Sequence, residues 1–440
     1  MSTQQKKLIV CTILVILLAG AGLASRSVAE ESWRGTKITL LTRSWHGIAE
    51  WVVPEFEKET GCKVEVVTMG AMPIRRKALV ELVNRTGAYD LISMDSKAVP
   101  LFNPYMFDLN KFLSDPTLFE PWFQEALNDY FPENLQLLNI EGKQVSLPYR
   151  FYFLILQYRK DLFQDPNEKA AFKLKYGYEL APPTTWKQLT DIAEFFTRPE
   201  QDLYGLSLMA GRNEQLVQIY LYYLLGLGGK PLGPNLEVLI NSDVGVKALK
   251  RLIKHLEFAP PEAIGFDYPE AVRFFLGGGA AMMPNWAVAM AAGRPGELKK
   301  KGIELDVARI PEVGHPFVGM WTIGIPEDSK NKLAAFKFIQ YVAKYDQAKK
   351  RALELFSFSP QKSIMKDPDI GAKVPAGFME MMAWYMENGR AYLWTGPYGD
   401  PLMTKLKDRL SAAVVGDETP EEALDMAAAE WESILRPFKK

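Results

Sequence analysis

Aromatic side chains stand beside polar side chains at several places in this chain of 440 residues. Such pairs occur at Trp45-His46, in Tyr149–Tyr152, at Asn285-Trp286 and in the run Tyr392–Asp400. A sugar offers hydroxyls, which carboxylates, amides and guanidinium groups bind, and C–H faces, against which flat rings pack. The mixture is typical of a carbohydrate site, although any one of these aromatic residues also fits a buried core.

Two short apolar segments organise this chemistry. Residues Ala280–Trp286 and Phe317–Pro326 are runs of small or apolar side chains, each with a tryptophan and with glycine or proline close by. Their length and composition predict two buried strands. Trp286 and Trp321 would then present their rings to a crevice, which is where α/β proteins bind ligands.

Three further strands, alternating with two helices, are predicted near the amino end of the chain. The strands span Lys37–Arg43, Val64–Val67 and Tyr89–Met94. This alternation implies parallel pairing with right-handed crossovers, and ligands of such sheets lie beyond the carboxyl ends of the strands. Trp45 and His46 follow the first of these strands and Asp95 follows the third, so we expect all three side chains at the ligand.

Other chemistries find little support in the sequence. The formal net charge is -1, which gives no sign of a nucleic-acid partner. The three histidines have no metal-ligand spacing. The triple glycine Gly277–Gly279 lacks the lysine and hydroxyl residue of a phosphate-binding loop, and no nucleophile elbow is present. We therefore expect neither a metal nor a cofactor.

The first 29 residues have the form of a secretory signal peptide. Lys6 and Lys7 precede an apolar run from Leu8 to Leu18, and the small residues Ser27-Val28-Ala29 fit a cleavage site. Cleavage there would release a periplasmic protein that begins at Glu30. No cysteine stands at the cleavage region, so a lipid anchor is not expected.

Several segments, in this order and spacing, resemble the extracytoplasmic solute-binding proteins of ABC importers, in the carbohydrate group to which maltose-binding protein belongs. The similarity runs over nearly all of the mature chain. The matching segments are Glu55–Val66, Tyr89–Asp95, Gly142–Phe163, Pro182–Trp186, Ala280–Trp286, Pro316–Gly319 and Ser329–Ala335.

The resemblance implies an α/β protein with the two-lobed periplasmic-binding-protein fold of type II, whose ligand cleft lies between the lobes. It implies three chain crossings between the lobes, near residues 151–154, 316–319 and 359–363. The amino-terminal lobe would comprise residues 30–152 and 318–360. The carboxyl-terminal lobe would comprise residues 153–317 and 361–440, and residues 1–29 would be the signal peptide.

The resemblance also implies roles for single residues. Asp95 would bind sugar hydroxyls, Tyr152 would make a polar contact beside the hinge, and an aromatic ring from Trp394 or Tyr398 would stack on the sugar. His46 and Arg150 are added from local reasoning alone. The full set of expected ligand contacts is Trp45, His46, Asp95, Arg150, Tyr152, Asn285, Trp286, Gly319, Trp321, Trp394, Tyr398 and Asp400.

The function implied is capture of a mono- to oligosaccharide by hinge closure, followed by delivery to the membrane permease subunits of an ABC importer. The protein would act as a monomer and not as an enzyme. Two alternatives stay open. The same fold could hold a polyamine or another small cation against Asp95 and the tryptophans. A secreted glycoside hydrolase would need two carboxylates that flank the scissile bond.

Overall fold

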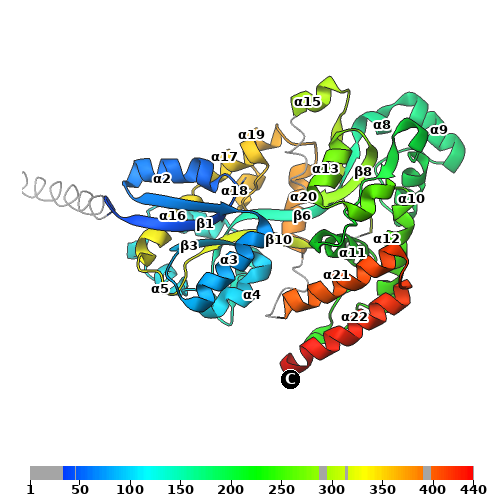
Figure 1. The fold of residues 1–440 in the computed structure, drawn as a ribbon. Coiled ribbons are helices and arrows are strands. Elements are labelled where there is room, and N and C mark those ends of the chain that lie inside the picture. Colours follow the sequence, from blue (N-terminus) through cyan, green and yellow to red (C-terminus); the bar gives the residue numbers. More distant parts are fainter. Residues whose placement is uncertain (1–32, 45, 287–294, 313–315, 390–397, 440) are drawn as a thin grey trace, which may run out of the picture.

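The computed structural model describes residues 33–44, 46–286, 295–312, 316–389 and 398–439. Over these ranges the chain is a mixed α/β protein with two lobes, and one long strand, β6 (Leu147–Arg159), runs through both (Figure 1). Within the same ranges, no helix combines the length and the apolar character that crossing a bilayer requires.

Parallel strands form the edge of the sheet in the first lobe. Strand β1 (Lys37–Arg43) pairs in parallel with both β2 (Lys63–Met69) and β3 (Leu91–Asp95). The crossovers contain α2 (Val53–Thr60) and α3 (Ala71–Asn84). This arrangement confirms the alternation predicted from the sequence.

The sheet continues from the first lobe into the second through β6. Its residues 147–153 pair with β10 (Val318–Gly324), and its residues 154–158 pair with β8 (Ala280–Trp286). Strand β7 (Tyr204–Leu206) adds to β8, and β9 (Leu305–Ala308) pairs with β6. The strand order is therefore β2-β1-β3-β10-β6-β8-β7, and both tryptophan-bearing strands predicted from sequence are confirmed.

Helices cover the sheet in both lobes. In the first lobe they are α4 (Val99–Phe102), α5 (Asn110–Leu113), α6 (Phe123–Asp129), α7 (Pro132–Gln136), α16 (Lys332–Val342), α17 (Tyr345–Leu355), α18 (Lys362–Met365), α19 (Pro368–Gly371) and α20 (Phe378–Asn388). The remaining helices are α8 (Lys160–Gln164), α9 (Pro166–Tyr176), α10 (Trp186–Phe195), α11 (Glu214–Gly226), α12 (Asp243–Leu256), α13 (Tyr268–Leu276), α15 (Pro295–Lys300), α21 (Gly399–Val415) and α22 (Pro420–Leu435). A two-stranded hairpin, β4 (Asn139–Ile140) and β5 (Lys143–Gln144), precedes β6.

Two large hydrophobic cores mark the two lobes. Phe151, Phe153 and Ile155 of β6 pack in the first core, whereas Leu154 and Leu156 pack in the second. Phe317 belongs to the second core, and the next residue, Val318, belongs to the first. The chain thus passes between the two cores within β6, and again between Phe317 and Val318.

The third crossing, expected near residues 359–363, was placed wrongly. Side chains from Ile364 to Met386 pack in the first core, and the next described core residue, Tyr398, packs in the second. The reason is the apolar face of α20, because its Tyr385 ring lies 4.6 Å from the ring of Phe153. Residues 364–386 were assigned from sequence to the second lobe, but they pack with the first. The remaining lobe boundaries stay a prediction.

Candidate ligand-binding site

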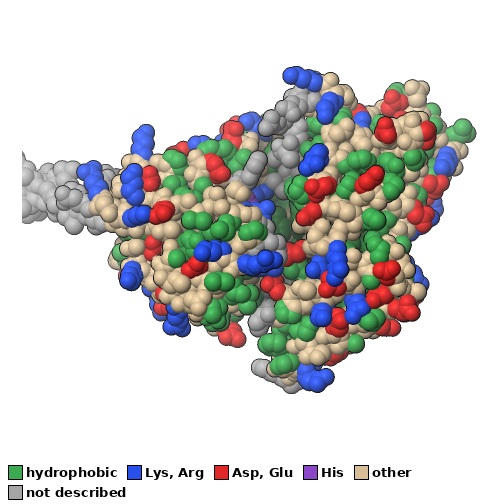
Figure 2. All heavy atoms as spheres, in the orientation of Figure 1, with side chains coloured by type: hydrophobic (Ala, Val, Ile, Leu, Met, Phe, Trp, Pro, Cys, Tyr) green, Lys and Arg blue, Asp and Glu red, His purple; other side chains and the backbone are tan. Residues whose placement is uncertain are grey.

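Three of the side chains predicted to bind the ligand lie next to one another across three adjacent strands. Trp321 of β10 is the cross-strand partner of Asp95 in β3 and of Arg150 in β6. Directly opposed residues of antiparallel strands point to the same face of a sheet. Asp95, Trp321 and Arg150 therefore share one face, beside the place where β6 leaves the first lobe. In the space-filling view a groove separates the two lobes (Figure 2).

Asp95 is held in place by several donors. The hydroxyl of Tyr152 donates to both of its carboxylate oxygens, at 2.8 and 2.9 Å. The backbone N–H of Lys97 donates to Oδ1 at 3.0 Å, and the ammonium group of Lys97 lies 3.7 Å from Oδ2. Burial, together with the charge of Asp95, raises the pKa of Tyr152 well above its ordinary value, so this phenol remains a neutral donor.

Gly319 provides room for Tyr152 and does not frame the site with a side chain. The two residues are cross-strand partners, and a Cβ on Gly319 would lie 2.2 Å from both Cζ and Oη of Tyr152. Such a contact is far inside van der Waals distance, so only glycine lets the tyrosine ring lie over this strand.

Trp286 comes to the same place from the second lobe. Its ring centroid lies 5.1 Å from that of Tyr152, edge to face, and its Nε1–H donates to Oε1 of Gln215 at 3.1 Å. The preceding residue, Asn285, is fully buried, and its Oδ1 accepts from the backbone N–H of Trp286 at 2.6 Å. Neighbouring residues of a strand point to opposite faces, so Trp286 reaches the groove while the Asn285 side chain enters the core.

His46 is buried against the site and supports Trp321. Its Nδ1 lies 2.7 Å from the hydroxyl of Tyr149, and its ring centroid lies 4.9 Å from that of Trp321. Burial is the main cause that lowers the pKa of His46 well below its ordinary value, and the charges of nearby arginines act in the same direction. The imidazole is therefore neutral and belongs to the packing beneath Trp321.

Arg43, at the carboxyl end of β1, was not singled out from the sequence. Its guanidinium carbon lies 5.2 Å from the centre of the Trp321 ring, a cation–π distance. Tyr268, the first residue of α13 in the second lobe, was missed as well. Burial raises the pKa of Tyr268, and the positive charges of Arg150 and Arg43 oppose that rise. Arg43 could have been identified from the sequence, because it ends a predicted strand next to the strand that leads to Asp95.

An ionic contact joins the lobes beside this site. Arg75 of α3 lies 3.0 Å from Oε1 of Glu214, at the start of α11, and 2.9 Å from Oδ1 of Asp400, at the start of α21. We call these three residues the Arg75 bridge. Figure 1 shows α3 in one lobe and both partner helices in the other. Asp400, expected at the ligand, is thus engaged by Arg75.

The remaining expected contacts lie elsewhere. Tyr398 is buried in the second core, where its ring packs against Phe438 at a centroid distance of 5.3 Å. Trp45 and Trp394 fall outside the described residues. Among the residues that the structure does describe, no group of three or more His, Cys, Asp or Glu side chains is placed to hold a metal ion.

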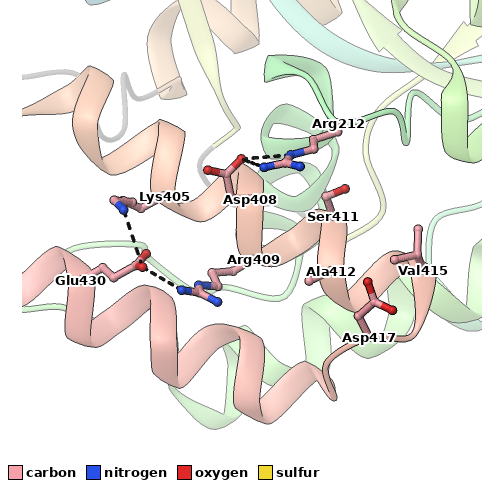
Figure 3. Close-up of a pocket in the computed structure, with 9 residues that line it drawn as sticks. All are labelled: Arg212, Lys405, Asp408, Arg409, Ser411, Ala412, Val415, Asp417 and Glu430. Atoms are coloured by element: carbon pink, nitrogen blue, oxygen red, sulfur yellow. Dashed lines mark hydrogen bonds and ion pairs between the residues drawn. The ribbon is translucent and has the colours of Figure 1, made fainter.

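A surface pocket lies between α21 and α22, and its charged side chains pair with one another (Figure 3). Arg409 lies 2.8 Å from both Glu418 and Glu430. Arg212 lies 3.1 Å from Asp408. In this pocket oppositely charged side chains form ion pairs. In the groove between the lobes, by contrast, arginine lies against an aromatic ring.

Comparison with known proteins identifies relatives along most of the chain. The family profile described as bacterial extracellular solute-binding protein matches residues 46–349. A probable ABC transporter-binding protein of Deinococcus radiodurans is 27% identical over 331 residues, which cover 72% of this chain and 74% of that protein. The mannitol-binding protein of Pseudomonas aeruginosa is 24% identical over 344 residues, with coverage of 76% and 70%.

A solved structure shares the same overall fold. It is an ABC transporter solute-binding protein from Agrobacterium radiobacter K84 in complex with ribitol. The TM-score is 0.79 with 28% sequence identity, and the match covers 91% of this chain and 99% of that one. The two-lobed architecture expected from the sequence is therefore confirmed.

Proposed function

The chain belongs to the bacterial extracellular solute-binding protein family, and we propose that it is the substrate-binding component of an ABC importer for a sugar or sugar alcohol. The observation that carries this proposal is the meeting of hydroxyl-binding groups and rings between the lobes. Asp95, Arg150 and Trp321 come from three adjacent strands of one lobe, and Trp286 faces them from the other. The relatives named for mannitol and ribitol support a polyhydroxylated cargo.

The contacts support a mechanism of closure around the cargo. Asp95 and Arg150 would bind hydroxyls, while the rings of Trp286 and Tyr152 would pack on C–H faces. Because these groups come from two lobes, the cargo binds fully only when the lobes approach, so it shifts the population toward the closed form. The Arg75 bridge would add an ionic contact to that closed form.

The rest of the proposal follows from the family and the sequence. The mature protein would begin at Glu30, after removal of residues 1–29, and would act in the periplasm as a monomer. It would hand its cargo to the permease subunits of the importer. It would release the cargo chemically unchanged, as a receptor and not as an enzyme.

The structure gives reasons to prefer this proposal over the two alternatives. A polyamine would have to bind beside Arg43 and Arg150, whose positive charges repel a cation. A glycoside hydrolase would need two carboxylates around the scissile bond, yet Glu214 and Asp400 are both engaged by Arg75.

A calorimetric titration of the chain from Glu30 onward tests the proposal. The panel contains mannitol, ribitol, glucose, maltose, acidic sugars and spermidine, and the mixtures are analysed afterwards for products. We expect saturable binding of at least one sugar or sugar alcohol, which is recovered intact. Binding of spermidine alone, or formation of a hydrolysis product, would rule the proposal out.

A further inference from the structure

Two arginines in the cleft, Arg43 and Arg150, form no ion pair with any carboxylate that the structure describes. The side chain of Arg150 is 7% exposed, and Arg43 lies partly buried over the Trp321 ring. Across the described ranges, neither guanidinium group has a carboxylate oxygen within the 4.0 Å of an ion pair. The partly exposed Arg198 of the second lobe is different, because it pairs with both oxygens of Glu168 at 2.7 and 2.6 Å.

A guanidinium group cannot escape burial by losing its proton at neutral pH. Burial lowers the pKa of Arg150 to about 10, and the charge of Arg43 adds to the decrease. Even so, both side chains are cations near pH 7. The first lobe therefore holds two positive charges close together, in a setting where unpaired charge is unfavourable.

The carboxylate of Asp95 does not balance this pair of charges. Asp95 influences Arg43, but its oxygens already accept from Tyr152 and from the backbone of Lys97, whose ammonium group also lies close. The sequence of residues 287–294, 313–315 and 390–397 contains no Asp or Glu. These three segments therefore contain no acidic side chain that could balance the pair.

The two charges face the interlobe space. Arg150 shares its sheet face with Asp95 and Trp321 through their cross-strand pairing. Tyr268 of the second lobe lies near enough for both arginines to act on its pKa. A group bound between the lobes would thus meet the two arginines on the side of the first lobe.

We propose that the cargo is an acidic sugar derivative, whose carboxylate or phosphate is bound by Arg43 and Arg150. This inference rests on the proposed function and narrows its cargo. A guanidinium fork matches the planar oxygens of a carboxylate and the oxygens of a phosphate. A neutral sugar could accept hydrogen bonds from the same donors, but closure over it would bury two positive charges without balancing them.

Matched compounds that differ only in the acidic group provide the test. The set is glucose, glucuronate and glucose 6-phosphate, together with sorbitol and gluconate, titrated calorimetrically into the wild-type chain. We expect at least one acidic member to bind ten times or more tightly than its neutral partner. The preferred member of the glucose series separates a carboxylate cargo from a phosphate cargo.

Two outcomes distinguish failure of this inference from failure of the proposed function. Equal or tighter binding of the neutral partners would overturn the acidic cargo and leave the sugar receptor intact. Binding of spermidine with no response to any sugar, neutral or acidic, would overturn both.

Variants of Arg150 test whether this residue causes the preference for the acidic compound over its neutral partner. In Arg150→Gln, the affinity for the acidic member should fall at least thirtyfold, while that for the neutral partner changes less than threefold. Arg150→Lys keeps the charge and should retain part of the preference. The control is Arg212→Gln, which alters an exposed, paired arginine and should change neither affinity. Equal losses for both compounds in Arg150→Gln would contradict the inference.

A second readout needs no ligand. Replacing Arg150 by Met removes an unbalanced buried charge, so the Tm of the ligand-free protein should rise. Replacing Arg198 by Met removes a paired charge, so the Tm should fall. A decrease for Arg150→Met as large as that for Arg198→Met would mean that the protein itself balances Arg150, which would overturn the inference.

Discussion

The two sides of the cleft are built differently. The first lobe presents Asp95, Arg150 and Trp321 from the middle of a sheet, where cross-strand pairing fixes each position. The second lobe presents Trp286 at a strand end, and its other groups stand at the starts of helices. In the proposed mechanism, the first lobe would therefore supply the preformed recognition surface, and the second lobe would supply the surface that closes over it.

The charges on the two sides are also complementary. Glu214 and Asp400 lie in the first turns of α11 and α21, where the helix macrodipole favours acidic side chains. The first lobe meets them with Arg75. Opposite charges on the two faces favour their approach, which suits a protein that closes over its cargo.

The largest expected difference between the two sides concerns their tryptophans. Trp321 is 7% exposed and packs against His46, so Trp321→Ala should cost about 3–5 kcal/mol of unfolding free energy and also weaken binding by about 2–4 kcal/mol. Trp286 is only half-buried, so Trp286→Ala should weaken binding with a clearly smaller loss of stability. Urea unfolding and calorimetry measure the two effects, and equal losses of stability would contradict the comparison.

Acid should destabilise both lobes through their buried histidines. Burial lowers the pKa of His255 to about 3, from an ordinary value near 6.5, so the folded protein binds fewer protons than the unfolded chain between these values. Stability is therefore complete above about pH 6.5 and declines as the pH falls, by about 3 kcal/mol at pH 4 from His255 alone. His46 is shifted in the same direction. Thermal unfolding of wild type and His255→Gln between pH 7 and 4 checks this, and identical slopes would refute it.

The hydrogen bond between Tyr152 and Asp95 should matter less than either tryptophan. Tyr152→Phe removes a donor to a charged carboxylate, which is worth about 1.5–3 kcal/mol, and leaves the ring against Trp286 in place. We expect weaker sugar binding with a nearly unchanged fold, measured by calorimetry and circular dichroism. Full affinity in Tyr152→Phe would show that Asp95 does not need this donor in order to bind.

The Arg75 bridge should have a smaller effect, and one that depends on salt. Arg75→Ala removes the ionic contacts to Glu214 and Asp400 that favour closure, so the affinity should fall about tenfold, or ~1.4 kcal/mol. The wild-type affinity should weaken as salt screens these charges, and that of the variant should weaken less.

The matched control for Arg75→Ala is the exposed pair Arg212–Asp408 on the second lobe. Surface pairs contribute about 0–1 kcal/mol, so Arg212→Ala should leave the affinity unchanged. If both variants had the same affinity at every salt concentration, the Arg75 bridge would have no role in closure.

Much of the fold was predictable because its signals are local or ordered along the chain. Ala280–Trp286 is a strand as predicted, since a run of small and apolar residues fits a position buried on both faces. The parallel strands at the amino end followed from alternating strand and helix patterns. The third crossing was misplaced, because the packing of α20 against Phe153 is a contact between residues far apart in sequence.

The site was only partly predictable. Asp95, Arg150, Tyr152, Trp286 and Trp321 do come together around the groove between the lobes. The sequence could not tell that Asn285 turns into the core, since the side of a strand that faces a ligand depends on its pairing. Nor could it reveal the partner of Asp400, because Arg75 stands on a helix of the other lobe.

A tryptophan-fluorescence titration of the mature chain tests the central claim most directly, because Trp321 and Trp286 lie on opposite sides of the proposed site. It would be run on the wild type and on Trp286→Phe with the tightest-binding sugar from the panel. We predict a saturable change at micromolar sugar in the wild type, reduced in Trp286→Phe although the sugar still binds. An unchanged signal in the variant would place the sugar away from Trp286 and contradict a cargo enclosed between the two lobes.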